Sequence, residues 1–298
     1  MKLLITGVAG AIGSILADVL INQGHKVTGI DNLSSGNLKN INPKINFIKR
    51  DIREISSKTL NNIDVVFHLA ALTKLTPSII HPIDYHDVNV NGTINLLGLA
   101  RLNRVKRVVF ASSGAVYGHR KNVVEEETMM PMPINPYSTT KLIGEEYMKC
   151  WSKCFNLDTV SLRFFNVYGA RENYNSEYIC LIAKFFKQKK RGNPLTICGN
   201  GEQRYDFIDV RDVVDAIIKA GLSTKPMCGE SINIGTGKNY SINEISKMIG
   251  GEIKFIPNRE GDVNWSLANN YKAFKYLNWK PKYKLEDYIK RIKNDLGE

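Results

Sequence analysis

The sequence predicts an α/β protein, with a doubly wound parallel sheet and a smaller, discontinuous α/β domain. Strand-like and helix-like segments alternate through residue 120, which is typical of a parallel sheet with crossover helices. Residues 65–70 and 108–112 are short runs rich in β-branched and aromatic side chains, as in strands buried on both faces. A chain of 298 residues can bury one large core or two unequal ones.

The first predicted unit is a strand, a glycine turn and a helix. Residues 2–6 form an apolar strand, and residues 14–22 carry apolar side chains at helical spacing. Between them lie Gly7, Gly10 and Gly13, spaced G-x-x-G-x-x-G rather than the commoner G-x-G-x-x-G. Glycines let the backbone turn tightly and approach a pyrophosphate, whose charge is favourable at the helix N-terminus. The turn therefore indicates a dinucleotide site.

An acidic residue ends the second predicted strand. That strand spans residues 25–30 and is followed by Asp31, eighteen residues after Gly13. An acid at this point accepts hydrogen bonds from the adenosine ribose hydroxyls, and its charge repels a 2′-phosphate. We therefore expect NAD rather than NADP as the cofactor.

Tyr137 and Lys141 lie four residues apart on a predicted helix, so their side chains share one face. A phenol with an ordinary pKa of about 10 is a poor base at neutral pH, but a nearby cation favours the phenolate. The pair can therefore form a group that removes a proton from an alcohol. The spacing also arises by chance on amphipathic helices, so it gains its meaning from the glycine turn upstream.

Together, the glycine turn, Asp31 and the Tyr-x-x-x-Lys pair resemble the NAD-dependent epimerase/dehydratase family of nucleotide sugars, within the extended short-chain dehydrogenase/reductases. The resemblance runs from about residue 2 to the end of the chain. Further family-like segments lie at residues 51–52, 68–71, 89–93, 111–118 and 163–169. It implies a Rossmann domain for NAD, formed by residues 1–165 plus about 207–235. A nucleotide-sugar-binding domain is then expected from about 166–206 plus 236–298.

The same resemblance assigns roles to individual residues. The expected catalytic residues, of which the last two also contact NAD, are Ser113, Tyr137 and Lys141. The other expected NAD contacts are Gly7, Gly10, Ala11, Ile12, Gly13, Asp31, Asn32, Asp51, Ile52, Leu69, Ala70, Ala71 and Asn89. The substrate is expected to contact Thr73, Ser113, Asn166, Arg204, Arg259, Asp262 and Ser266.

Among the substrate residues, the resemblance implies that Asn166, Arg204 and Arg259 contact the diphosphate and that Asp262 holds the nucleotide ribose. A guanidinium fork suits phosphate oxygens better than an ammonium does. Without the surrounding motifs, a surface salt bridge would be the simpler interpretation of each arginine.

The implied reaction begins when Tyr137, as phenolate, removes the proton from the carbon-4 hydroxyl of a nucleotide-linked hexose. Hydride passes to NAD, Ser113 hydrogen-bonds the same sugar oxygen, and Lys141, with the positive nicotinamide, lowers the tyrosine pKa. In a 4-epimerase the 4-keto sugar rotates and takes the hydride back, so NAD is regenerated. The family's dehydratases and decarboxylases carry an acid shortly after the catalytic hydroxyl, where this chain has Gly114 and Ala115. An isomerase acting at carbon 4 therefore fits best.

The sequence says less about which sugar is the substrate than about the reaction at carbon 4. In 4-epimerases the residue four positions after the ribose-holding acid can limit the space around carbon 2, and that residue is Ser266 here. Its small side chain leaves room for an N-acetyl group, unless the loop turns it elsewhere. UDP-GlcNAc and UDP-GalNAc are therefore candidate substrates beside UDP-glucose and UDP-galactose. Thr73 lies where epimerases often have another polar or basic residue beside the sugar.

Two other functions stay open at this point. A nucleotide-sugar reductase, or an epimerase of another sugar nucleotide, would share the three catalytic residues, and exchangeable rather than retained NAD(H) would reveal a reductase. A non-catalytic NAD-sensing module is the second alternative. It is disfavoured because Ser113, Tyr137 and Lys141 are all present.

Composition limits the other classes. The net charge of +12 would suit nucleic acid, but the basic residues are scattered apart from 184–191 and no nucleic-acid motif accompanies them. No signal peptide precedes the strand at residue 2, and no apolar run approaches the length of a membrane span. We expect a cytoplasmic protein that binds a nucleotide sugar, no nucleic acid and no membrane.

Five cysteines without ligand-like pairing indicate reduced thiols and no metal site. Cys150 and Cys154 are expected to be buried and half-buried on one helix. The family further implies a homodimer through the helices near 87–103 and 138–155.

Overall fold

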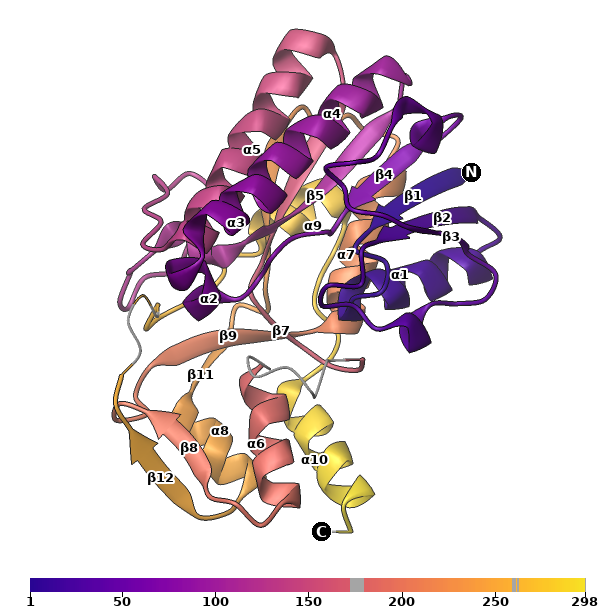
Figure 1. Cartoon of the computed structure of the whole chain (residues 1–298). Coiled ribbons are helices and arrows are strands. Elements are labelled where there is room, and N and C mark those ends of the chain that lie inside the picture. Colours follow the sequence, from indigo (N-terminus) through magenta and orange to yellow (C-terminus); the bar gives the residue numbers. More distant parts are fainter. Residues whose placement is uncertain (172–179, 259–260, 262, 298) are drawn as a thin grey trace.

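The computed structural model describes residues 1–171, 180–258, 261 and 263–297 (Figure 1). Its strands are β1 (Lys2–Thr6), β2 (Lys26–Asp31), β3 (Asn46–Lys49), β4 (Val65–His68), β5 (Arg107–Ser113), β6 (Asp158–Phe164), β7 (Asn166–Tyr168), β8 (Leu195–Cys198), β9 (Arg204–Asp209), β10 (Glu230–Ile234), β11 (Asn239–Ser241) and β12 (Ile253–Ile256). Its α-helices are α1 (Ala11–Asn22), α2 (Leu75–Ile80), α3 (Pro82–His86), α4 (Gly92–Leu102), α5 (Pro136–Phe155), α6 (Leu181–Lys190), α7 (Val210–Leu222), α8 (Ile242–Ile249), α9 (Tyr271–Leu277) and α10 (Leu285–Asp295). Shorter helical turns are η1 (Leu38–Asn40), η2 (Ser57–Leu60), η3 (Asp87–Asn91) and η4 (Gly114–Tyr117).

A seven-stranded sheet confirms the predicted doubly wound fold. Its strand order is β10-β6-β5-β4-β1-β2-β3, and every neighbouring pair is parallel. The chain winds from β1 outward through β2 and β3, then returns to β4 and winds the other way. The order therefore reverses between β1 and β4, and ligands of such sheets bind in the crevice at the carboxyl ends of those two strands.

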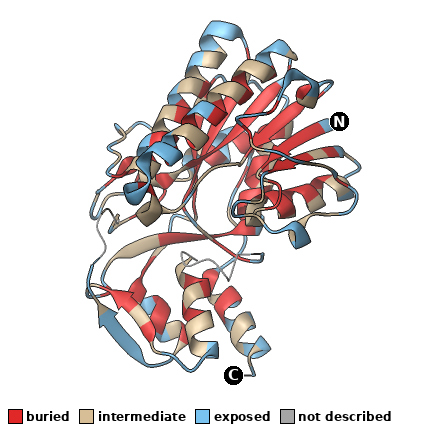
Figure 2. Cartoon of the chain, in the orientation of Figure 1, coloured by how far each residue is buried: buried red, intermediate tan, exposed pale blue. Residues whose placement is uncertain are grey.

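Helices cover both faces of this sheet. Helices α4 and α5 lie on one face, and α1 and α7 lie on the other (Figure 1). The strands between them are buried along most of their length (Figure 2). One apolar cluster fills each side: Leu16, Leu20 and Ile217 belong to the cluster under α1 and α7, and Leu97 and Met148 to the cluster under α4 and α5. This packing fixes the strand ends that form the site.

The chain after β6 builds two smaller sheets. Strand β9 pairs parallel with β7 and antiparallel with β11, and β12 pairs parallel with β8. A separate apolar cluster joins these sheets to α6, α8 and α10 and includes Phe185, Ile245 and Ile289. Strand β10 belongs to the large sheet. The division of the chain into an NAD-binding domain and a nucleotide-sugar-binding domain stays a prediction.

Some local expectations need correction. Helix α1 begins at Ala11 rather than residue 14, because apolar spacing marks only its buried face, whereas extended Gly10 is its N-cap. Cys150 and Cys154 were expected to be buried and half-buried, but both are exposed, since they occupy the outer face of the last turns of α5. None of the five cysteines, all of which lie in the described residues, forms a disulfide. In the described part of the chain, no helix combines the length and the apolar character that spanning a membrane requires.

Candidate active site

The glycine turn lies at the reversal point of the sheet. Gly7 directly follows β1 with a φ of +73°, and a Cβ there would lie 2.8 Å from the Ala70 nitrogen. A Cβ on Gly13 would lie 2.2 Å from the Gly7 oxygen, so both positions require glycine. Gly10 caps α1 without a side-chain hydrogen bond. The uncapped helix start and the closely packed turn suit a pyrophosphate, so these residues fit NAD.

Asp31 lies against this turn. Its carboxylate accepts hydrogen bonds from the Ala9 nitrogen at 2.9 Å and from the Leu33 nitrogen at 2.7 Å. Each carboxylate oxygen can accept a further bond, so the group can still receive ribose hydroxyls. The residue expected to bind the adenosine ribose is thus held in place by the turn expected to bind the pyrophosphate.

Asn32 and Asp51, both expected near the adenosine, contact each other. The Asn32 amide donates to an Asp51 carboxylate oxygen at 2.8 Å, and the Arg53 Nε donates to the other at 2.9 Å. Arg53 also pairs with Asp87. The hydrogen bonds from Arg53 lower the pKa of Asp51 to about 2, so Asp51 is ionised at neutral pH. Its neighbour Ile52 is buried against Gly92 at the start of α4.

Residues 69–71 and Asn89 form the wall after β4. The Leu69 and Ala70 nitrogens donate to the Thr6 hydroxyl at 3.2 Å, which fixes the chain at the end of β4. The Asn89 amide accepts from the Leu72 nitrogen at 2.8 Å and donates to the Thr140 hydroxyl at 3.0 Å. Asn89 therefore ties this segment to helix α5, and its expected NAD contact stays a prediction.

Hydrogen bonds at the N-terminus of α5 fix the residue at which this helix begins. Asn135 is the N-cap, its side chain accepts from the Ser138 nitrogen at 2.9 Å, and Pro136 occupies the first turn. Tyr137 therefore enters the helix in its first turn. Ser113 is the last residue of β5, and its hydroxyl lies near enough to the Tyr137 phenol to lower the pKa of that phenol. The Ala115 nitrogen donates to the Ser113 hydroxyl at 3.1 Å and orients it.

Gly144 lets α5 approach β5 closely. A Cβ at Gly144 would lie 2.5 Å from Phe110 Cζ, so only glycine permits this spacing. The approach carries the buried Lys141 ammonium to the Ala111 carbonyl, to which it donates at 2.8 Å. The Lys141 nitrogen lies 5.0 Å from the centre of the Phe110 ring and 5.9 Å from that of the Tyr137 ring. Ser113, Tyr137 and Lys141 are thus brought together, as expected from the sequence.

The electrostatics of this trio differ from the expectation. Burial raises the pKa of the Tyr137 phenol, and the hydrogen bond with Ser113 opposes the rise. Burial also lowers the pKa of Lys141 to about 7, against the opposing charge of Glu145. The expectation that Lys141 lowers the tyrosine pKa is therefore not met by the chain alone, because desolvation outweighs one cation that is itself partly neutral.

Three of the expected substrate residues lie together beside β7 and β9. The Asn166 amide donates to the Ser266 hydroxyl at 3.1 Å, and the Ser266 nitrogen donates to the Arg204 carbonyl at 2.9 Å. Ser266 is 8% exposed and its hydroxyl also accepts from the Asp206 nitrogen. Its side chain therefore faces the strands, and its role near the sugar stays a prediction.

The Arg204 guanidinium already has protein partners. It pairs with Glu244 at 2.9 Å and donates to the Asn239 side chain at 3.1 Å. The surface salt bridge considered from the sequence is thus present, and binding a diphosphate would require Arg204 to share or exchange it. Thr73 is exposed in the segment before α2.

Arg259 and Asp262 lie outside the described residues. Between them, the Gly261 carbonyl accepts a hydrogen bond from the Asn135 amide at 3.3 Å, and a Cβ on Gly261 would contact Ile79 and Leu75. Gly261 therefore lies beside the start of α5 and beside α2.

Comparison with known proteins decides the family. Residues 3–235 match the model of the NAD-dependent epimerase/dehydratase family. The chain belongs to the NAD-dependent epimerase/dehydratase family. The matched region includes the glycine turn, Asp31 and the Ser113, Tyr137 and Lys141 trio.

Relatives of this family match over nearly the whole chain. A putative UDP-glucose 4-epimerase of Methanocaldococcus jannaschii is 38% identical and aligns over 98% of this chain and 97% of its own. The solved UDP-N-acetylglucosamine 4-epimerase of Methanobrevibacter ruminantium, in complex with UDP-N-acetylmuramic acid, is 35% identical, with a TM-score of 0.91 over 97% and 95% of the two chains. UDP-glucuronic acid 4-epimerase of Bacillus cereus, solved with UDP-glucuronic acid and NAD, is 31% identical, with a TM-score of 0.88 over 98% and 100%.

Membership of the epimerase/dehydratase family confirms three predictions from the sequence: the family itself, the doubly wound fold and the NAD cofactor. The roles of single residues stay predictions.

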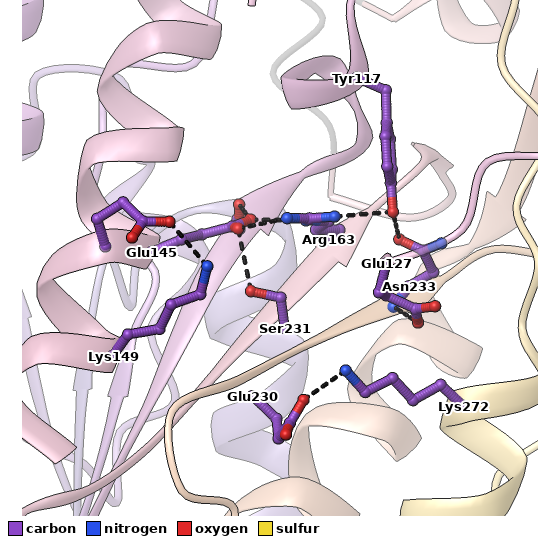
Figure 3. Close-up of polar contacts among 11 residues, drawn as sticks. Tyr117, Glu127, Glu145, Lys149, Arg163, Glu230, Ser231, Asn233 and Lys272 are labelled. Atoms are coloured by element: carbon purple, nitrogen blue, oxygen red, sulfur yellow. Dashed lines mark hydrogen bonds and ion pairs between the residues drawn. The ribbon is translucent and has the colours of Figure 1, made fainter. Parts of the chain in front are cut away.

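Sequence reasoning missed a buried charge network that begins one helical turn after Lys141, at Glu145; Figure 3 shows the contacts of Glu145 and Arg163. Glu145 and Arg163 form a two-pronged ion pair, at 2.9 and 2.7 Å, and the Arg163 Nη1 donates to the Tyr117 hydroxyl at 2.8 Å. Two signals could have found it. Glu145 continues the four-residue spacing of Tyr137 and Lys141, and Arg163 is a charge between the apolar residues Leu162 and Phe164.

Proposed function

We propose that this protein is an isomerase that interconverts the carbon-4 epimers of a UDP-hexose through a transient 4-keto sugar, with NAD kept through each turnover. Its substrates are UDP-glucose and UDP-galactose and, beside them, UDP-GlcNAc and UDP-GalNAc. The observation that carries the proposal is the meeting of Ser113, Tyr137 and Lys141 at the carboxyl ends of a sheet whose reversal point holds the glycine turn. Relatives named as UDP-sugar 4-epimerases, matched over nearly the whole chain, support it.

The chemistry required of the chain is proton transfer at one sugar oxygen. Bound NAD supplies the capacity to take a hydride from carbon 4 and return it. Tyr137 Oη takes the proton of the carbon-4 hydroxyl and gives it back after the sugar has turned. Ser113 Oγ, which acts on that phenol, orients the same sugar oxygen. The positive charge of Lys141 favours the phenolate and offsets part of the effect of burial.

The residues after Ser113 favour epimerisation over elimination. Gly114 and Ala115 follow it in the turn η4, and neither can act as an acid or base on carbon 5 or 6. Gly114 is packed against the Phe165 ring, so a side chain there would displace it. A dehydratase or decarboxylase would lack its carboxylate at this point of the fold.

The test is a product assay on protein purified without added cofactor. UDP-glucose, UDP-GlcNAc and UDP-glucuronic acid are supplied separately, and the carbon-4 epimers are resolved. We expect conversion of UDP-glucose and UDP-GlcNAc, lost in Tyr137→Phe, which keeps the ring and removes the hydroxyl. Conversion of UDP-glucuronic acid alone would replace the proposed sugar and keep the reaction. No conversion of any of them, with NAD supplied, would refute the proposed function.

Ser266 is proposed to leave the space that an N-acetyl group requires at carbon 2. The Ser266 hydroxyl contacts the amide of Asn166, which is expected beside the substrate diphosphate, so we propose that a tyrosine here would extend towards the substrate and reduce that space. In Ser266→Tyr we expect the kcat/KM for UDP-GlcNAc to fall at least tenfold relative to that for UDP-glucose, because one misfitting group in a pocket costs about 1–3 kcal/mol. Ser266→Ala, which stays small, is the matched control. An unchanged ratio in the tyrosine variant would refute this role.

Two further parts of the proposal concern the state of the protein. We propose a homodimer through α4 and α5, where Leu102 is 74% exposed and Phe155 is partly exposed at the helix ends. Light scattering on the purified protein tests it, and a monomeric mass would refute it. Five cysteines without a disulfide in the described residues support the proposal of a reducing compartment, the cytoplasm.

A further inference from the structure

Helix α5 carries an acidic side chain one turn beyond Lys141. Tyr137, Lys141 and Glu145 follow each other at four-residue spacing, so they form one stripe on the buried face of the helix. Glu145 has no exposed surface. Its carboxylate is the charged group that supports the protonated form of Lys141 against burial.

The Glu145 carboxylate is held by four donors from three strands. One oxygen accepts from Arg163 Nε on β6 at 2.9 Å and from the Ser112 hydroxyl on β5 at 2.5 Å. The other accepts from Arg163 Nη2 at 2.7 Å and from the Ser231 hydroxyl on β10 at 3.0 Å (Figure 3). Its lone pairs are fully used, so its position is fixed relative to the sheet. Ser112 directly precedes the catalytic Ser113.

Arg163 extends this network. It is 2% exposed, and its Nη1 donates to the Tyr117 hydroxyl, which in turn donates to the Asn233 amide oxygen at 2.8 Å. Burial alone would lower the pKa of Arg163, but the contacts with Glu145 raise it above its ordinary value, so Arg163 stays charged. Removing either partner would leave a buried charge unpaired.

The other titratable groups around Lys141 offer no counter-charge. His68 on β4 is neutral, because burial and Lys141 lower its pKa to about 3. Burial raises the pKa of Tyr137, so in the chain alone its phenol supplies no negative charge. Arg163 on β6 is positive, because the contacts with Glu145 raise its pKa, so it offers no negative charge either. Among the described titratable residues that influence Lys141, Glu145 is therefore the one whose charge stabilises its ammonium.

We propose that Glu145 is a positioning residue of the epimerase reaction: from one helical turn away it favours the charged form of Lys141, and Arg163, Ser112 and Ser231 keep Glu145 in place. This inference rests on the proposed function for its consequence and on the contacts above for its geometry. A charged Lys141 favours the Tyr137 phenolate, so the network serves the proton transfer without touching the substrate.

The test measures the titration of Lys141 itself. Protein carrying lysine labelled with carbon-13 at the ε position is titrated by NMR, and Lys141→Met identifies the signal. Wild-type protein is compared with Glu145→Gln and with Glu146→Gln, which removes an exposed carboxylate of the same helix that pairs with Lys149. NAD content is matched between samples. We expect the Lys141 pKa to be about 7 in the wild type, lower by about one unit or more in Glu145→Gln and unchanged in Glu146→Gln.

If Glu145→Gln does not fold, a double variant provides the same test of the Lys141 pKa. Glu145→Gln combined with Arg163→Gln leaves no unpaired charge, and its Lys141 pKa is also expected below that of the wild type. A pKa equal to or above the wild-type value in whichever variant folds would overturn the inference.

The kinetic counterpart is the pH profile of turnover. Its basic limb should move to lower pH in Glu145→Gln while the KM for the sugar nucleotide changes little; a limb that does not move contradicts the inference. The NMR titration requires no sugar, so a protein that fails the product assay refutes the proposed function and leaves this inference testable.

Discussion

Gly144 sets the distance between α5 and β5. We therefore expect Gly144→Ala to push α5 away from β5 and to displace Lys141 in the active site. The added Cβ would lie 2.5 Å from Phe110 Cζ, about 0.9 Å short of the 3.4 Å at which ordinary contact begins. Phe110 is buried, so the helix must move outward by a comparable distance. The Lys141 bond to the Ala111 carbonyl, now 2.8 Å, would stretch to roughly 3.7 Å and be lost.

The size of the effect follows from this displacement. Overpacking of this kind costs about 1–3 kcal/mol of stability, and a displacement near 1 Å at a catalytic group costs about 100-fold in kcat. Denaturant unfolding and the initial rate of epimerisation measure the two effects. A Gly144→Ala variant with wild-type stability and rate would refute the reasoning.

Phe110→Leu provides the matched control, because it removes the ring atoms that the new methyl group would meet. Combined with Gly144→Ala, it should be more stable than the sum of the single changes predicts, by about 1 kcal/mol. Strict additivity of the two changes would show that the contact is not the cause.

Two further predictions follow. In Gly13→Ala the new Cβ would lie 2.2 Å from the Gly7 oxygen and open the turn, so the NAD released by acid from the purified protein should fall at least about tenfold; undiminished NAD would contradict the assigned site. Burial raises the pKa of Glu125 to about 8, so its contribution to stability is present below its ordinary pKa of about 4.5 and is lost as the pH rises through 8. Thermal unfolding should therefore show Glu125→Gln to be more stable than the wild type at pH 9, by the order of a few kcal/mol, and equally stable at about pH 4, below the ordinary pKa; no gain at pH 9 would contradict that shift.

The glycine turn could be predicted because its causes are local. Gly7 follows a strand, Gly13 begins the packed part of a helix, and Asp31 ends the next strand, all within about thirty residues. The Tyr137 and Lys141 pair is also local, since one helix fixes its spacing. Sequence patterns over this range follow directly from the helical and strand periods.

The electrostatics of the site could not be predicted, because distant residues decide them. Lys141 was expected to act on Tyr137, but its charge depends on burial under β5 and on Glu145, whose position depends on Arg163 and Ser231. The interactions of Arg204 are decided in the same way by Glu244, forty residues later, across the pairing of β9 with β11. Such contacts are set by tertiary packing.

The measurement that tests the central claim most directly follows the hydrogen on carbon 4. The UDP-sugar that the product assay identifies is supplied with deuterium at carbon 4, to protein purified without added cofactor. We predict that the epimer formed retains the deuterium at carbon 4, because the hydride is taken and returned within one site. Conversion with loss of the deuterium to solvent, or conversion that survives Tyr137→Phe, would contradict the account.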